Sequence, residues 1–179
     1  IKRCLQLMQR YASRRLIATG ILWDNPVTRS RVNQLVSAAT AVEALVRRIA
    51  IALDLGEAVP TEAFLACKVI GSEYLWKAAD ALVQVLGGRG YVETNIASQI
   101  LRDARSFLLS EGPTETLLMY LGSRALEVGT ELERFIAVTL RAPEIAGQLR
   151  EIGEAVCERR SNEAAIENTG QPNRTYWTS

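Results

Sequence analysis

Two long segments with helical periodicity, residues 27–55 and 61–86, constrain this chain more than any other feature. Apolar side chains recur in both at steps of three and four residues, which is the spacing of one buried face of an α-helix. A helix over residues 27–55 would span roughly 40 Å. Only the turn from Gly56 to Pro60 separates the two segments, so the two helices must lie antiparallel. The stripes consist of Val32, Leu35, Val36, Ala39, Val42, Val46, Ile49, Ala50 and Leu53, and of Ala66, Val69, Ile70, Tyr74, Ala78, Leu82 and Val85.

The neighbouring segments add further helices to this hairpin. Residues 1–19 also have helical spacing and, because the chain opens on Ile1 rather than on a methionine, we expect them to end a helix that begins upstream in a longer polypeptide. The pattern predicts a short helix over residues 96–104, irregular chain over 105–112, and a helix over 113–128 with its proline in the first turn. Strand-like alternation is absent, so the sequence predicts an all-α protein, an antiparallel four-helix bundle.

The C-terminal third carries weaker signals. Residues 1–128 are expected to form the bundle, residues 129–160 an additional helical extension, and residues 161–179 an extended tail rich in turn residues. The extension offers six apolar positions for packing, which are Leu132, Phe135, Ile136, Leu149, Ile152 and Val156.

Composition excludes several classes of site. The chain contains no histidine, so histidine triads and His-based zinc sites are ruled out, and proton chemistry must rest on Glu, Asp, Lys, Tyr or Cys. A net charge of +1 argues against nucleic acid or a charged membrane surface as a partner. Cys4, Cys67 and Cys157 never form a CxxC pair, which indicates free thiols in a reducing compartment and no metal site. No apolar run reaches the ~18 residues of a membrane span, so we expect a cytoplasmic protein, or one of the mitochondrial matrix in a eukaryote.

A glycine cluster follows the second long helix. Gly87, Gly88 and Gly90 allow backbone dihedrals that a Cβ forbids, or let another molecule approach closely. The cluster indicates either a binding turn or a plain helix stop. It is a poor dinucleotide fingerprint, because Glu93 stands where the third glycine belongs and a helix, not a strand, precedes it.

Glu111 is the candidate catalytic residue. It lies between the apolar run from Phe107 to Leu109 and Gly112, on a segment expected to be irregular. Partial burial there would favour proton uptake near neutral pH, as a general base needs. The alternative is a carboxylate ahead of Pro113 that is stabilised by the dipole of the next helix. The residues leave both interpretations open.

The motifs around these residues resemble those of a known family. The run QVLGGRGYVETN, followed by ILRDARSFLLSEGPTETL, is similar to the C-terminal helical domain of the acyl-CoA dehydrogenases, with its Q-x-x-G-G-x-G-[FY], R-D-A-[RK] and E-G-[TP] motifs in order. The resemblance extends from about Tyr11 to Ala125. It implies α,β-dehydrogenation of an acyl-CoA or acyl-carrier thioester. Glu111 would be the base that removes the α-proton, Gly112 would line the thioester, and hydride would pass to FAD.

The resemblance also implies cofactor contacts. Arg15 matches the arginine of an R-x-x-F-G motif that faces the flavin pyrophosphate, where a guanidinium forms forked hydrogen bonds. The glycine turn would meet the adenine and pyrophosphate end of a flavin held mainly by the neighbouring subunit. This implies a homo-oligomer, dimer or tetramer, or pairing with a related subunit, and an electron-transfer flavoprotein as a possible partner. The remaining cofactor-binding candidates are Gln84, Val85, Leu86, Gly87, Gly88, Pro113, Thr114 and Glu115.

Three departures from the family pattern leave other functions open. Ala18, Thr19 and Gly20 replace the Phe-Gly of the first motif with one extra residue, and the glutamine that usually follows falls near Pro26 or Val27. The residue after Glu111-Gly112 is proline instead of the usual threonine. The alternatives are an acyl-CoA oxidase and a degenerate, non-catalytic helical scaffold or assembly subunit.

A further expectation is that Arg102, Asp103 and Arg105 form an ion-pair set that fixes the Glu111 segment.

Overall fold

The computed structural model describes residues 1–125 and 131–167, of which 161–167 and Ala125 are described by their backbone alone. Its contacts divide the chain into two compact units, Ile1–Tyr120 and Leu121–Ser179. Each unit is built almost entirely from helices, and the only strands among the described residues form one small hairpin. The all-α prediction is therefore confirmed, apart from that hairpin.

The first unit is organised around the predicted helical hairpin. Helix α2 spans Pro26–Asp54 and helix α3 spans Thr61–Leu86, close to the bounds expected from the apolar stripes. Asn25 caps α2, because its side-chain oxygen accepts hydrogen bonds from the backbone N–H groups of Val27 (2.9 Å) and Thr28 (3.3 Å). Gly56, at φ 69°, reverses the chain after α2.

Replacing Asn25 with alanine is expected to destabilise the chain by about 1 kcal/mol, because two N–H groups at the start of α2 lose their acceptor. Thermal and chemical unfolding followed by circular dichroism measures the loss. Asn33→Ala is the matched control, since Asn33 is exposed in the interior of α2 and caps nothing. Equal stability of the two variants would contradict the capping role.

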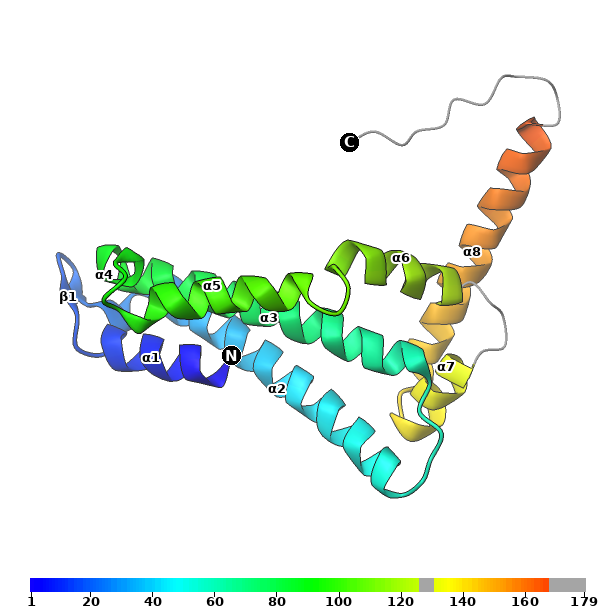
Figure 1. Ribbon diagram of the computed structural model, residues 1–179, viewed down its shortest axis with the longest axis horizontal. Helices are drawn as coiled ribbons and strands as arrows, with labels where there is room; N and C mark the ends of the chain where they lie inside the picture. Colours follow the sequence, from blue (N-terminus) through cyan, green and yellow to red (C-terminus); the bar gives the residue numbers. More distant parts are fainter. Residues whose placement is uncertain (126–130, 168–179) are drawn as a thin grey trace. The chain divides into compact units, whose positions relative to one another are not determined.

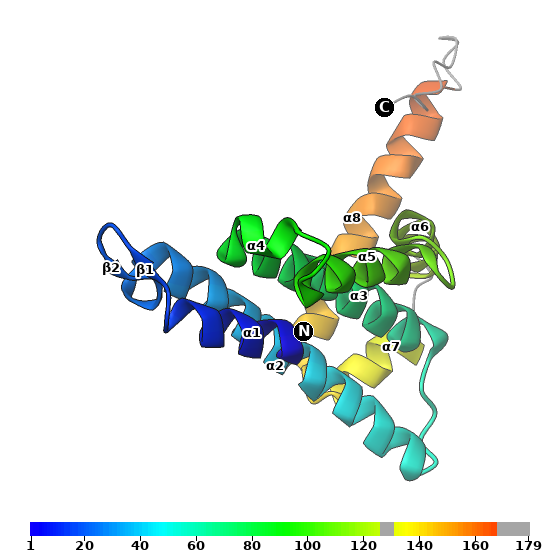
Figure 2. The same ribbon diagram turned by 60° about the vertical axis from the view of Figure 1, so that its left-hand side comes forward.

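The first helix is shorter than its periodicity predicted. Helix α1 spans Lys2–Ala12, and the chain then forms the antiparallel hairpin of β1 (Leu16–Ile17) and β2 (Gly20–Ile21) and the 3₁₀ turn η1 (Leu22–Asp24). Ser13 ends α1, and its hydroxyl donates back to the Gln9 carbonyl at 2.9 Å. The prediction of a helix to residue 19 was wrong because β-branched residues and Gly20, at φ 122°, favour a tight extended turn. Figure 2 shows this hairpin at the end of α1 opposite the N-terminus.

The segment after α3 is also more helical than expected. A single turn, α4 (Gly88–Tyr91), follows α3, and α5 then spans Ile96–Leu109 instead of ending at residue 104. Its buried positions Ala97, Ala104 and Leu108 continue one helical face through the stretch expected to be irregular. Helix α6 spans Thr114–Ala125, so the division between the two units falls inside it.

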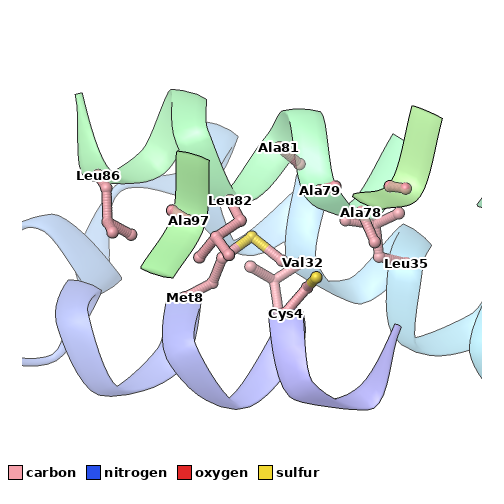
Figure 3. Close-up of a cluster of buried hydrophobic side chains, with 11 residues drawn as sticks. Cys4, Met8, Val32, Leu35, Ala78, Ala79, Ala81, Leu82, Leu86 and Ala97 are labelled. Carbon is pink, nitrogen blue, oxygen red and sulfur yellow. The ribbon is translucent and has the colours of Figure 1, made fainter. Parts of the chain in front are cut away.

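The core of the first unit lies where α3 packs against α1, α2 and α5 (Figure 1). Figure 3 shows Cys4 and Met8 of α1 pointing toward Leu82 and the alanines of α3. The small side chains of Ala78, Ala79 and Ala81 let three helices approach α3 closely. Met8 and Leu82, which have no exposed surface, fill the space at the centre of this core. This packing fixes the C-terminal half of α3, which ends at the glycine cluster.

The second unit contains the helical extension. After α7 (Glu131–Arg134) and the π-helical turn η2 (Phe135–Thr139), helix α8 spans Pro143–Glu167. Phe135 and Ala146 are buried, and Arg150 pairs with Glu133. Of the six expected apolar contacts only Ile152 is wrong, because it is exposed. The expected extended tail is wrong for residues 161–167, because α8 continues to Glu167, and residues 168–179 lie outside the described part of the chain.

Candidate functional site

The loop from Ser110 to Pro113 joins α5 to α6 and carries Glu111. Helix α5 closes where the Ser110 N–H and hydroxyl both donate to the Ser106 carbonyl, at 2.9 and 2.6 Å. Glu111 and Gly112 then both take left-handed backbone conformations, with φ of 56° and 103°. For a non-glycine residue this conformation costs about 1–2 kcal/mol, so the surrounding structure must hold Glu111 there.

The Glu111 side chain is exposed in this chain. The expected partial burial is therefore wrong for the chain by itself. The apolar run before it offers no cover, because α5 remains helical through Leu109 and buries only Leu108, while Phe107 and Leu109 are each 56% exposed. Glu115, in the first turn of α6, is exposed as well.

A lysine from α3 holds this loop. Lys68 is half-buried, and its Nζ donates a hydrogen bond of 2.6 Å to the backbone carbonyl of Gly112. Sequence reasoning did not find Lys68. Its partner lies 44 residues away along the chain, and no motif or periodicity connects them.

Gly112 and Thr114 show two further constraints at the start of α6. A Cβ on Gly112 would lie 2.9 Å from Cδ2 of Leu117, so a side chain there would displace Leu117 and would also be strained by the φ of 103°, whether or not a substrate is bound. Thr114 is buried, with 7% of its surface exposed, and its hydroxyl oxygen has no hydrogen-bond partner within the described part of the chain. Leaving a buried hydroxyl such as that of Thr114 without a hydrogen-bond partner costs about 1–3 kcal/mol.

The glycines in the turn at the C-terminal end of α3 are required for different reasons. Gly87, with φ 60° and ψ −140°, takes a backbone conformation that is open to glycine alone. None of the residues that the structure describes would contact a Cβ on Gly87 or Gly88. Gly90 is needed for packing, because a Cβ there would lie 2.8 Å from the Val83 backbone. The turn therefore stops the helix and also leaves an open backbone surface at Gly87 and Gly88.

An arginine-rich pocket adjoins this turn. It has a volume of about 750 Å³, and Arg10, Arg14, Arg15 and Arg89 line it together with Leu86 and other residues from α1, β1 and the start of α5. We call it the arginine pocket. Two of the predicted cofactor residues, Arg15 and Leu86, line this one pocket, together with three guanidinium groups that sequence reasoning had not assigned. The run of arginines between Arg10 and Arg15 was the available signal.

The other predicted cofactor residues lie elsewhere. Gln84 faces a separate groove of about 550 Å³ between α2 and α3, and Val85 packs against the core. The arginine pocket and Glu111 are not brought together, because they lie at opposite ends of α5. Its 14 residues separate Ile96, which lines the pocket, from the Glu111 loop by about 20 Å.

The expected ion-pair set does not form among residues 1–125 and 131–167. Arg102 and Asp103 are exposed on α5, and the Arg105 guanidinium lies over the ring of Trp76, 5.7 Å from its centre. The prediction was wrong because residues 102–105 belong to helix α5 rather than to the loop, whose tether is Lys68 instead.

Two of the three thiols, those of Cys4 and Cys67, offer no alternative chemistry. Burial raises the pKa of both the Cys4 and the Cys67 thiols, so these cysteines remain protonated and unreactive near neutral pH. Within the described residues, no cluster of acidic or cysteine side chains could hold a metal ion. No helix in the described ranges is both long enough and apolar enough to cross a membrane.

Comparison with known sequences gives one family. A family model described as "Acyl-CoA dehydrogenase, C-terminal domain" matches residues 1–126. The chain is 33% identical over 66 residues to the very long-chain specific acyl-CoA dehydrogenase of human mitochondria, which covers 36% of this chain and 10% of that protein. It is 27% identical over 126 residues to the (2S)-methylsuccinyl-CoA dehydrogenase of Cereibacter sphaeroides, covering 70% of this chain and 23% of the relative.

Solved structures share the fold. The butyryl-CoA dehydrogenase of Megasphaera elsdenii superposes with a TM-score of 0.65 at 23% identity, covering 70% of this chain and 33% of that one. A structure of the electron transferring flavoprotein of Acidaminococcus fermentans gives a TM-score of 0.65 at 21% identity, covering 71% and 33%. The chain thus spans a third or less of each of these four proteins.

Proposed function

Through residues 1–126 the chain belongs to the acyl-CoA dehydrogenase family, and on this premise we propose that it is the helical part of a flavin-dependent acyl-thioester dehydrogenase. The observation that carries the proposal is the left-handed backbone of Glu111, at φ 56°, in a loop that Lys68 tethers. Costly backbone conformations of this kind gather at functional sites. The family resemblance gives this glutamate the role of base.

The proposed reaction removes two hydrogens from neighbouring carbons of the acyl chain. The carboxylate of Glu111 takes the α-proton, and the β-hydrogen leaves with its electron pair as hydride. A bound FAD would supply the acceptor for that hydride, and the acyl chain would be left as a trans-2-enoyl thioester. Removal of the α-proton requires hydrogen-bond donors at the thioester carbonyl, and the backbone N–H of Glu111 is the donor that this chain would supply.

The base must be shielded from water to work. Glu111 is exposed in this chain, so the proposal assigns its shielding to the bound substrate and to regions outside the matched domain. This is in keeping with the relatives, in which the matched region is a third or less of the chain.

The residues present fit a flavin dinucleotide. Four guanidinium groups in the arginine pocket suit the two phosphates, because each can form charge-assisted forked hydrogen bonds. The open backbone at Gly87 and Gly88 gives room for the adenosine end. The unpartnered hydroxyl of Thr114 offers a hydrogen bond near the base, which is where Pro113 removes the usual threonine contact.

The distance between the arginine pocket and Glu111 supports an active site that is assembled from more than one chain. The arginine pocket and Glu111 lie at opposite ends of α5, so we propose that they serve different active sites, each completed by a second copy. An electron-transfer flavoprotein would then reoxidise the flavin.

A scaffold without catalysis is the second candidate. The β1–β2 hairpin occupies the place of the Phe-Gly motif, and Pro113 replaces a flavin contact. Both changes favour a chain that keeps the helical fold for assembly and binds no flavin.

Flavin content and anaerobic reduction by substrate separate the two candidates. We expect the protein, purified with the partner regions that its relatives carry, to be yellow and to lose its visible absorbance when an acyl-CoA of suitable length is added without oxygen. A colourless protein that takes up no added FAD would favour the scaffold. A yellow protein that no acyl thioester bleaches would contradict the dehydrogenase.

A further inference from the structure

We propose that Lys68 is a positioning residue for the Glu111 loop, an inference that rests on the proposed function for its catalytic consequence but not for its structural one. Its Nζ donates to the Gly112 carbonyl at 2.6 Å, and this bond ties the N-terminal half of α3 to the chain between α5 and α6. It acts on the peptide next to the base, not on the substrate.

The charged donor of this bond is paired with a neutral acceptor. Lys68 is half-buried, and among the described residues no carboxylate pairs with its ammonium group. A half-buried ammonium needs a strong partner, and here that partner is one neutral backbone carbonyl. Hydrogen bonds to charged groups are stronger than neutral ones, so this single contact can hold a short loop.

The loop has little else to hold its conformation. Glu111 and Gly112 are both left-handed, and the carbonyl of Gly112 is not part of the α6 ladder, which begins where the Leu117 N–H donates to the Pro113 carbonyl at 3.1 Å. Pro113 contributes no N–H of its own. Without Lys68, Glu111 would lose the constraint that offsets its backbone cost and would return to more common conformations.

Loss of the Lys68 bond would change the orientation of Glu111 without changing the binding of substrate or flavin. The direction of the Glu111 carboxylate and of its N–H follows from the backbone at Glu111 and Gly112, so Lys68 controls both without touching the substrate. Misplacement of a catalytic group by about 1 Å can cost about 100-fold in rate. The expected signature is a lower kcat with an unchanged KM and an unchanged flavin content.

Nuclear magnetic resonance on the chain itself tests the structural part. A residue at positive φ gives a strong NOE between its own Hα and amide proton, so Glu111 is expected to show one in the unmodified chain. In Lys68→Met this NOE is expected to fall to the level seen in α5, while Lys68→Arg, which keeps a charged donor, retains it. Lys2→Met is the matched control, because Lys2 pairs with Glu43 on the surface of α1 and α2.

A second measurement needs no variant, so poor folding of Lys68→Met would not remove the test. The hydrogen bond should give a coupling between the Lys68 Nζ nitrogen and the Gly112 carbonyl carbon in the unmodified chain. Absence of that coupling, or an unchanged Glu111 NOE in Lys68→Met, would overturn the proposal.

Kinetics of the flavin-loaded protein test the catalytic part. Lys68→Met is expected to lower kcat by about 100-fold at unchanged KM, and Lys68→Arg to restore most of it. An increase in KM alone would overturn the positioning role. Normal turnover in Glu111→Gln would instead remove the assignment of the base, and the coupling and NOE results for Lys68 would still stand.

Discussion

Replacing Glu111 with glutamine is expected to lower turnover by about 10²–10⁴-fold, because the amide cannot accept the α-proton while its size and shape are nearly those of the acid. The change leaves the left-handed backbone and the Lys68 bond in place, since neither involves the side chain. The variant should therefore keep its flavin colour and its affinity for an acyl thioester. Stopped-flow absorbance under anaerobic conditions measures the rate of flavin reduction directly.

A matched control for this variant is Glu151→Gln. Glu151 is exposed on α8, outside the residues that match the family model, and its loss should leave the reduction rate unchanged. If Glu111→Gln is reduced as fast as the unmodified protein, the base is another residue. Loss of the flavin in this variant would mean that Glu111 supports binding rather than proton transfer.

The largest expected effect on stability is that of Leu82→Ala, about 2–5 kcal/mol. Leu82 has no exposed surface and lies at the centre of the cluster where α3 meets α1, α2 and α5. The alanines around it cannot extend into the space that the lost side chain leaves, because their side chains end at Cβ. For a chain of this size the midpoint of thermal unfolding should fall by about 10 °C.

Leu53→Ala provides the comparison for Leu82. Leu53 lies on α2 with 50% of its surface exposed, so its truncation removes far less buried area and should cost under about 1 kcal/mol. Differential scanning calorimetry on both variants measures the difference. Equal unfolding midpoints would show that α3 is not the centre of the core.

Much of the fold could be predicted from local pattern. The bounds of α2 and α3 agree closely with the apolar stripes, because Asn25, Gly56 and Gly87 mark the helix ends with strong signals. The hairpin after α1 could not be found this way, since two-residue strands are too short for an alternating pattern. The second half of α5 could have been found, because Ala97, Ala104 and Leu108 keep one helical face through it.

The candidate site was less accessible to sequence reasoning. The motifs led to Arg15, Leu86 and Glu111, and the structure places the first two together in one pocket. It adds Lys68, whose partner is distant in sequence and is a backbone atom, so no residue pattern encodes the contact. The exposure of Glu111 and its positive φ also depend on how α5 ends, and sequence pattern resolves helix ends poorly.

The separation of the arginine pocket from the Glu111 loop along α5 has a genetic consequence. If each active site combines the carboxylate of one chain with the guanidinium groups of another, two inactive mutants can rescue one another. Co-expression of a Glu111→Gln chain with an Arg15→Ala chain would then yield mixed assemblies in which one site has lost both groups and another is intact. Complementation of this kind, absent when either mutant is expressed alone, would report the shared site without any structural measurement.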